Sequence, residues 1–160
     1  MIATHAEIRP LKSGDADGAR ALLHTMATTI PHFAGGEDYL RAALLGDSAE
    51  SRGIVAVEGG ALAGIVLYGK VAGTVGAGEV HFIITAPERL ADLGQGLLDG
   101  AVADLTKRGV RLIVVELADV PHFEPLRRFL SGNGFVEEAR IPDLYRDGVP
   151  LLISRREIAT

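Results

Sequence analysis

The stretch from Arg111 to Leu117 constrains the fold more than any other part of the sequence. Its residues 112–115, Leu-Ile-Val-Val, are continuously apolar, which is typical of a central strand covered on both faces. A helix is predicted before it, from about Leu93 to Arg108, with its apolar residues on one stripe. Before that helix a strand is predicted from Thr74 to Thr85, and Pro87 ends it. We therefore expect these two strands to pair in parallel across one β-α-β crossover.

The other predicted strands pair antiparallel. The strand from Gly53 to Glu58 is joined to the strand from Ala61 to Lys70 by Gly59-Gly60, which suits a two-residue hairpin turn because glycine adopts positive φ. With the strand that ends at Thr85, these two form a meander. Three further strands are predicted near the ends of the chain: Glu7 to Leu11, Phe135 to Ile141 and Pro150 to Glu157.

Three more helices complete the pattern. The first follows Ser13-Gly14-Asp15, whose side chains can accept from the free amides of a helix start, and it is predicted to stop before Thr28-Thr29-Ile30-Pro31. Its apolar stripe consists of Ala19, Leu22, Leu23 and Met26. The other two helices span about Glu37 to Leu45 and Phe123 to Leu130. The order β-α-α-β-β-β-α-β-α-β-β predicts a mixed α/β fold, in which a mostly antiparallel sheet contains one central parallel β-α-β crossover and carries helices on both faces.

Composition narrows the class of protein. The 160 residues are expected to form one domain, 1–160, with 48% hydrophobic residues, 23% charged residues and a net charge of -5. The absence of cysteine excludes a disulfide scaffold, a cysteine zinc site and a thiol nucleophile. The five histidines show no metal-ligand spacing, so we expect no metal. An acidic chain without basic runs also argues against nucleic acid as a partner.

No membrane partner is expected either. The longest nearly uninterrupted apolar stretch, from Ala61 to Tyr68, is far shorter than the roughly 20 residues that cross a bilayer. The first residues lack the basic and apolar regions of an export signal. We therefore expect a soluble, cytoplasmic protein.

Two glycine patterns resemble phosphate-binding loops. The first, Gly64-x-x-x-x-Gly69-Lys70, is rejected because its four intervening residues lie in the middle of a predicted strand and no helix follows. The second, Gly94 to Gly100, opens a predicted helix after a strand, and Glu116 stands where a ribose-binding acid would be in a dinucleotide fold. However, the residues from Pro87 to Leu93 separate strand and pattern, which a dinucleotide fold does not allow. The alternative is that Gly96 and Gly100 only let the helix pack closely on the sheet.

The chain resembles a known family over nearly its whole length. The residues that carry the resemblance are Ile8-Arg9-Pro10 with Asp15-Ala16, Val55 to Glu58, Ala63-Gly64, Thr85-Ala86-Pro87, Leu97-Leu98, Val115-Glu116, Pro121-His122-Phe123, Arg128 to Phe135 and, most specifically, Glu137 to Gly148. On these residues the chain is similar to the GNAT superfamily of N-acetyltransferases. The segment Glu137 to Gly148 looks like the last third of a bacterial GNAT subgroup.

The resemblance implies direct transfer of an acetyl group from acetyl-CoA, as cosubstrate, to the amine of a small molecule or peptide. It implies that the main chain of Ile83, Ile84 and Thr85 binds the pantetheine and the oxyanion. It also implies that the pyrophosphate lies on Arg89 and on the amides that open the helix, those of Leu93, Gly94, Gln95 and Gly96. The resemblance is also compatible with a homodimer.

The candidates for the general base lie on the strand before the helix. Side chains of a strand alternate, so Glu79, His81 and Ile83 are expected to share one face, and Glu79 and His81 are the candidate bases. The alternative is that both are polar residues near a sheet edge without a catalytic role. Tyr145 is the candidate acid for the leaving thiolate, with simple packing as its alternative role.

Several residues depart from the family pattern. The phosphate loop, Arg89 to Gly94, is one residue shorter than in the family, and Leu90 puts bulk where a phosphate should approach. Asp92 brings a negative charge there and is expected to cap the helix by accepting from the amides of Gly94 and Gln95. Leu130 stands where the family usually has the tyrosine that protonates the thiolate. These departures support a second hypothesis, a non-catalytic GNAT-like binding or assembly domain.

The acceptor cannot be identified from the sequence. Its pocket is expected between the segments Thr29 to Tyr39 and Lys70 to Gly78, since such pockets are built from variable loops. Three residues are candidates for its lining: His32, Phe33 and Tyr39.

Overall fold

The computed structural model describes residues 5–27, 36–46 and 50–159. Its strands are β1 (Glu7–Pro10), β2 (Arg52–Glu58), β3 (Ala61–Lys70), β4 (Ala77–Thr85), β5 (Leu112–Ala118), β6 (Val136–Arg146) and β7 (Val149–Glu157). Its α-helices are α1 (Ala16–Ala27), α2 (Gly36–Leu45), α3 (Gln95–Lys107) and α4 (Glu124–Gly132). In these parts of the chain, every helix is too short or too polar to span a membrane.

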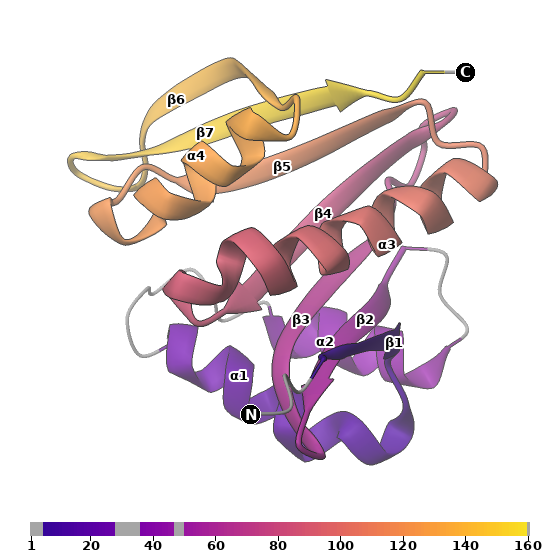
Figure 1. The fold of residues 1–160 in the computed structure, drawn as a ribbon. Coiled ribbons are helices and arrows are strands. Elements are labelled where there is room, and N and C mark those ends of the chain that lie inside the picture. Colours follow the sequence, from indigo (N-terminus) through magenta and orange to yellow (C-terminus); the bar gives the residue numbers. More distant parts are fainter. Residues whose placement is uncertain (1–4, 28–35, 47–49, 160) are drawn as a thin grey trace.

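The strands form one sheet in the order β1-β2-β3-β4-β5-β7-β6 (Figure 1). Neighbouring strands pair antiparallel except β4 and β5, which pair in parallel and are connected through α3. The predicted hairpin between β2 and β3 turns at Gly59 and Gly60, whose φ angles are 57° and 81°. The predicted mixed sheet with one parallel crossover is therefore confirmed.

Helices cover both faces of the sheet, as predicted. On one face, α3 and α4 pack against the sheet, and on the other face α1 and α2 do (Figure 1). The first layer buries Leu97, Leu98, Leu105 and Leu130 with Val66, Tyr68 and Ile113. The second layer buries Leu23 and Leu40 with Val55, Ile65 and Leu67.

Polar contacts fasten the last turns of α3 to the sheet. The hydroxyl of Tyr68 donates to Oδ2 of Asp104 at 2.9 Å, and Nε of Arg52 lies 2.9 Å from the same oxygen. Tyr68 is almost wholly buried, and burial and the carboxylate of Asp104 raise the pKa of its phenol. The buried hydroxyl is therefore satisfied by a single acceptor on the helix.

Element boundaries differ from the prediction at three places. β4 begins at Ala77 rather than Thr74, because the chain first turns through Gly73 and Gly76, both at positive φ. β6 continues past Ile141 to Arg146, with an irregular register in between. The helix before β5 begins earlier, in a 3-10 turn (Pro87–Arg89) followed by a π-helical turn (Leu90–Gly94). The predicted stop at residues 28–31 and the side chain of Met26 lie outside the described residues.

Candidate active site

A gap opens in the sheet where β4 and β5 diverge. The two strands pair only over Ala77–Glu79 of β4 and Leu112–Val114 of β5. Beyond this point β4 stays paired with β3 as far as Thr85, and β5 stays paired with β7 as far as Ala118. The main-chain groups of residues 80–85 that face β5 therefore have no strand partner in the described parts of the chain. Main-chain N–H and C=O groups require hydrogen-bond partners, so this edge is suited to an extended polar ligand.

The gap contains an apolar groove. One pocket of about 40 Å³ lies between β4, β5 and α4, and a second of about 50 Å³ continues it toward the start of α3. The two pockets share Ile83, Phe123 and Leu126. His81 and Glu116 stand at one end of the groove, and Thr85, Pro87, Leu90 and His122 stand at the other.

A β-bulge at His81 sets the direction of the side chains at this edge. Leu67 of β3 pairs with Phe82, but the next residue, Tyr68, pairs with Val80, so His81 is an extra residue in β4. A bulge interrupts the alternation of side chains. The prediction that Glu79, His81 and Ile83 share one face is therefore only partly right: Glu79 and His81 lie together, whereas Ile83 packs on the α3 face.

His81 is held from two sides. Its Nε2 lies 3.0 Å from the carbonyl oxygen of Glu50, and its ring stacks on Tyr39 with the ring centroids 3.8 Å apart. A carbonyl oxygen can only accept, so Nε2 carries a proton. In the neutral ring, Nδ1 then presents its lone pair.

Nδ1 of His81 is buried without a hydrogen-bond partner among the described residues. The side chain is only 5% exposed, and Nδ1 lies 3.4 Å from Oε1 of Glu79 without hydrogen-bond geometry. A buried polar atom that lacks a partner is uncommon in native proteins. An unsatisfied imidazole nitrogen beside a carboxylate is suited to accept a proton.

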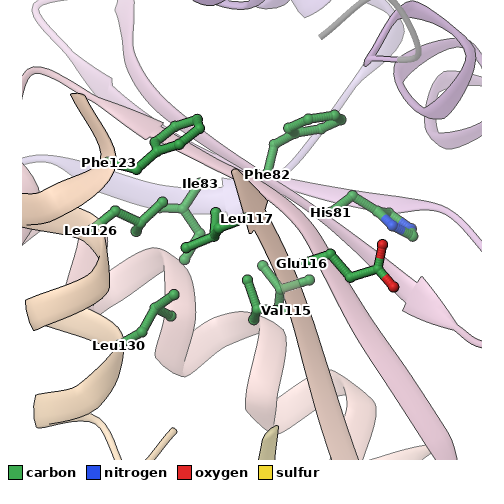
Figure 2. Close-up of a pocket in the computed structure, with 10 residues that line it drawn as sticks. His81, Phe82, Ile83, Val115, Glu116, Leu117, Phe123, Leu126 and Leu130 are labelled. Carbon is green, nitrogen blue, oxygen red and sulfur yellow. The ribbon is translucent and has the colours of Figure 1, made fainter. Parts of the chain in front are cut away.

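Glu116 and two tyrosines complete this end of the groove. Figure 2 shows the side chains of His81 and Glu116 on the same side of the gap, away from Leu126 and Leu130. Burial and, secondly, the charge of Glu79 raise the pKa of the Glu116 carboxyl. Burial, followed by the charges of Glu79 and Glu116, raises the pKa of Tyr39, and burial followed by Glu116 raises that of Tyr145. The site thus combines two carboxylates, two phenols and one imidazole.

Arg89 is engaged away from the groove. Its two terminal nitrogens donate to both oxygens of Glu58 at 2.9 and 2.6 Å, and its Nε donates to Asp92 at 3.0 and 3.2 Å. The prediction that Asp92 caps the helix is wrong, because Asp92 lies inside the π-helical turn and the turn has no side-chain cap. The amide of Gln95 instead donates to the main-chain oxygen of Asp92.

Comparison with solved structures identifies the fold. A protein from Desulfovibrio desulfuricans assigned to the GNAT family of acetyltransferases superposes with a TM-score of 0.85 at 28% identity, over 96% of this chain and 99% of that one. This chain has the GNAT fold. The aminoglycoside 6'-N-acetyltransferase of Enterococcus faecium follows at a TM-score of 0.78 and 15% identity (96% and 98% covered). Ard1 of Thermoplasma volcanium has a TM-score of 0.74 at 19% identity (97% and 99% covered). No protein-family model and no curated protein sequence matches the chain.

The GNAT resemblance stated from the sequence is thus confirmed, and the structural neighbours of the chain are acetyltransferases.

The glycine pattern at the helix start has a packing explanation. A Cβ on Gly94 would lie 2.8 Å from Leu90, one on Gly96 would lie 3.2 Å from Ile8, and one on Gly100 would lie 3.0 Å from Ile54. This agrees with the alternative that the glycines allow close packing. Leu93 is buried, and Leu130 lines the groove with hydrocarbon only.

The remaining site predictions fall at different places in the GNAT fold. Tyr39 contacts His81, but His32 and Phe33 lie outside the described residues. The sequence suggested Glu116 only as a ribose-binding acid, whereas it lines the groove beside His81. Its position as the one charged residue in an apolar strand was the signal that could have identified it. Among the described residues, no group of three or more potential ligands could hold a metal ion.

Proposed function

We propose that this chain transfers an acetyl group from acetyl-CoA to the primary amine of a small molecule or peptide by direct attack. The observation that carries the proposal is the buried Nδ1 of His81, which lies beside Glu79 at the mouth of the gap without a hydrogen-bond partner among the described residues. The likeness to GNAT acetyltransferases supports the same reaction. Acetyl-CoA would supply the activated acetyl thioester.

The main chain of β4 is proposed to hold the thioester arm. Main-chain groups of the stretch from Ile83 to Thr85 that are not directed toward β3 face the groove, and a pantetheine arm carries amides that hydrogen-bond to such groups as a neighbouring strand does. Main-chain N–H groups at this edge would also stabilise negative charge on the carbonyl oxygen that is attacked. The apolar walls exclude water from the reacting atoms.

His81 is proposed as the general base. The ammonium form of the acceptor must lose a proton before its nitrogen can attack the acetyl carbon, and Nδ1 of His81 accepts that proton while Nε2 keeps its own. Glu79, 3.4 Å away, stabilises the imidazolium that results. Glu79 thus supports His81, and the two residues act as a pair.

Glu116 and Tyr145 are proposed to interact with two other charged groups of the reaction, the ammonium of the acceptor and the departing thiolate. The carboxylate of Glu116 lies at the entrance and attracts the ammonium form of the acceptor. Tyr145 donates its phenol proton to the departing thiolate as the carbon–sulfur bond breaks, and it takes back the proton that the nitrogen loses as the amide forms. Burial and Glu116 raise the pKa of Tyr145, so the phenol retains this proton at neutral pH.

The residues present fit one end of acetyl-CoA and not the other. The groove fits the thioester arm, but the single cation at the start of the helix, Arg89, is paired with two carboxylates. That pairing, and the hydrocarbon of Leu130 in the groove, favour the second candidate function, a non-catalytic GNAT-like binding domain. The two candidates differ in whether acetyl groups are transferred.

A thiol-release assay tests the proposal. The chain has no cysteine, so free thiol formed from acetyl-CoA in the presence of a panel of primary amines is measured without background from the protein. Wild type should release thiol only when an amine is present, and His81→Gln should lower turnover about 100-fold or more. His24→Gln, an exposed histidine on α1, is the matched control and should match wild type.

Two results would contradict the proposal. Full turnover in His81→Gln would remove His81 as the base. A wild-type protein that neither releases thiol with any amine nor binds acetyl-CoA in calorimetry would favour the non-catalytic domain.

A further inference from the structure

The start of the α3 helix carries an ion cluster formed by Glu58, Arg89 and Asp92. All three guanidinium nitrogens of Arg89 donate to carboxylate oxygens: the terminal nitrogens to Glu58 and Nε to Asp92. Arg89 lowers the pKa of both carboxyl groups, so both are ionised at neutral pH. The cluster therefore has one positive and two negative charges, and its net charge is negative.

The cluster draws Arg89 away from the groove. Glu58 is the last residue of β2, and β2 lies on the side of β4 opposite to β5. The groove, in contrast, opens between β4 and β5, and neither Arg89 nor Asp92 lines it. Arg89 is also the only Lys or Arg between Lys70 and Lys107. The helix start thus directs no basic side chain of its own toward the groove.

Two amides of this helix start are already used. Pro87 has no N–H, the amide of Arg89 donates to the carbonyl of Ala86 at 2.9 Å, and that of Leu90 donates to the carbonyl of Pro87. Helix N-termini bind anions through amides that have no partner. Here that capacity is reduced, and the side chain of Leu90 occupies the groove wall instead.

A linear ligand whose reactive end reaches His81 would place its far end at Thr85, Pro87 and Leu90. Among the described residues, two of the four features that favour a diphosphate there are missing, a free cation and a positive net charge, and a third, the supply of free amides, is reduced. The fourth, the positive end of the helix, is opposed by Asp92. Among the residues that the structure describes, His122 is the one ionisable side chain that lines this end.

We propose that the chain recognises its donor by the pantetheine arm alone and gains no affinity from the nucleotide diphosphate. This inference rests on the proposed function. The acetyl donors that the chain accepts are therefore pantetheine thioesters as a class. Acetyl-CoA is one of them, and the chain does not prefer it over the others. The inference replaces the diphosphate-binding role that the resemblance implied for Arg89.

Calorimetric titration of the full chain with CoA and with pantetheine tests this directly. We expect the two dissociation constants to agree within about threefold, and neither to change appreciably between 50 mM and 500 mM salt, since screening weakens only charge contacts. A CoA affinity at least about thirtyfold higher than the pantetheine affinity would overturn the inference and leave the proposed function standing. If neither compound bound, the proposed function would fail with it.

A designed variant sharpens the test. The double variant Glu58→Gln/Asp92→Asn removes both carboxylates and frees Arg89, so it should acquire a preference for CoA over pantetheine of about tenfold that high salt abolishes. Glu88→Gln removes an exposed charge next to Arg89 without a contact to it, and it should keep the wild-type ratio. Arg89→Ala, checked for folding by circular dichroism, should leave CoA affinity unchanged. A loss of CoA affinity in Arg89→Ala with pantetheine affinity intact would overturn the inference.

Discussion

The carbonyl oxygen of Glu50 accepts a hydrogen bond from Nε2 of His81 at 3.0 Å, across 31 positions of the sequence. The next residue, Ser51, is buried, and its hydroxyl donates to the carbonyl oxygen of Tyr39 at 2.6 Å. Tyr39 in turn stacks on His81. The short segment before β2 therefore fixes both the tautomer and the plane of the proposed base.

Gly69 of β3 makes this arrangement possible. A Cβ built on Gly69 would overlap the carbonyl group of Glu50 and the amide of Ser51. We expect Gly69→Ala to lower the free energy of unfolding by about 1 to 3 kcal/mol, since the segment must move away. Urea denaturation measures this loss, and Gly132→Ala is the control, because a Cβ there meets no atom within 4 Å. Equal stability of the two variants would show that the segment yields without strain.

The hydrogen bond between Tyr68 and Asp104 gives a second prediction. Tyr68→Phe removes the hydroxyl that donates to Asp104, and we expect it to lower the free energy of unfolding by about 1 kcal/mol. The same substitution in an Asp104→Ala background should have little effect, because the partner is already absent. Equal losses in both backgrounds would assign the effect to packing and contradict the prediction.

The pair of Arg9 and Asp15 gives a prediction about pH. Both terminal nitrogens of Arg9 donate to Asp15, at 2.8 and 2.9 Å, and this contact lowers the pKa of the Asp15 carboxyl. The stabilisation is therefore present above the ordinary carboxyl pKa of about 3.9 and is lost as the pH falls through the lower folded-state value. Asp15→Asn should lose about 1 to 3 kcal/mol at pH 7 and much less near pH 3. Asp17→Asn, fully exposed in the same turn, should change stability by less than about 0.5 kcal/mol.

Glu116 should show the opposite dependence on pH. Burial raises the pKa of its carboxyl, with a further contribution from Glu79, so folding favours the protonated form. Its contribution to stability is present below the ordinary pKa of about 4.3 and is lost as the pH rises through the folded-state value. Glu116→Gln should therefore raise the free energy of unfolding at pH 7, by on the order of 0.5 kcal/mol, and this gain should disappear near pH 4. Thermal denaturation across this range, with Glu88→Gln as the control, checks it; a gain that persists at pH 4 would contradict it.

Local patterns predicted much of the fold. The apolar run at Leu112–Val115, the Gly59-Gly60 turn and the stop at Pro87 depend on near neighbours, and each lies where the sequence indicated. The bulge at His81 depends instead on how β4 aligns with β3, and no glycine or proline marks it. For this reason the shared face of Glu79 and His81 could be predicted, whereas the direction of Ile83 could not.

The ion cluster at the start of α3 could not be predicted for a similar reason. Arg89 and Glu58 are 31 residues apart and meet only because the ends of β2 and β4 lie near each other in the sheet. The sequence marked Asp92 as an unusual charge, but it assigned that charge to a cap. The structure assigns it to Arg89.

The gap between β4 and β5 also determines how the site responds to mutation. The part of the site that is proposed to bind the acetyl donor consists of main-chain peptide groups. Every residue except proline contributes the same N–H and C=O groups there. Alanine scanning of Ile83, Ile84 and Thr85 would reshape the groove and leave those groups in place. The sequence of β4 can therefore change while its edge persists, and a single substitution would alter the proposed chemistry only at positions such as His81, Glu79 and Glu116.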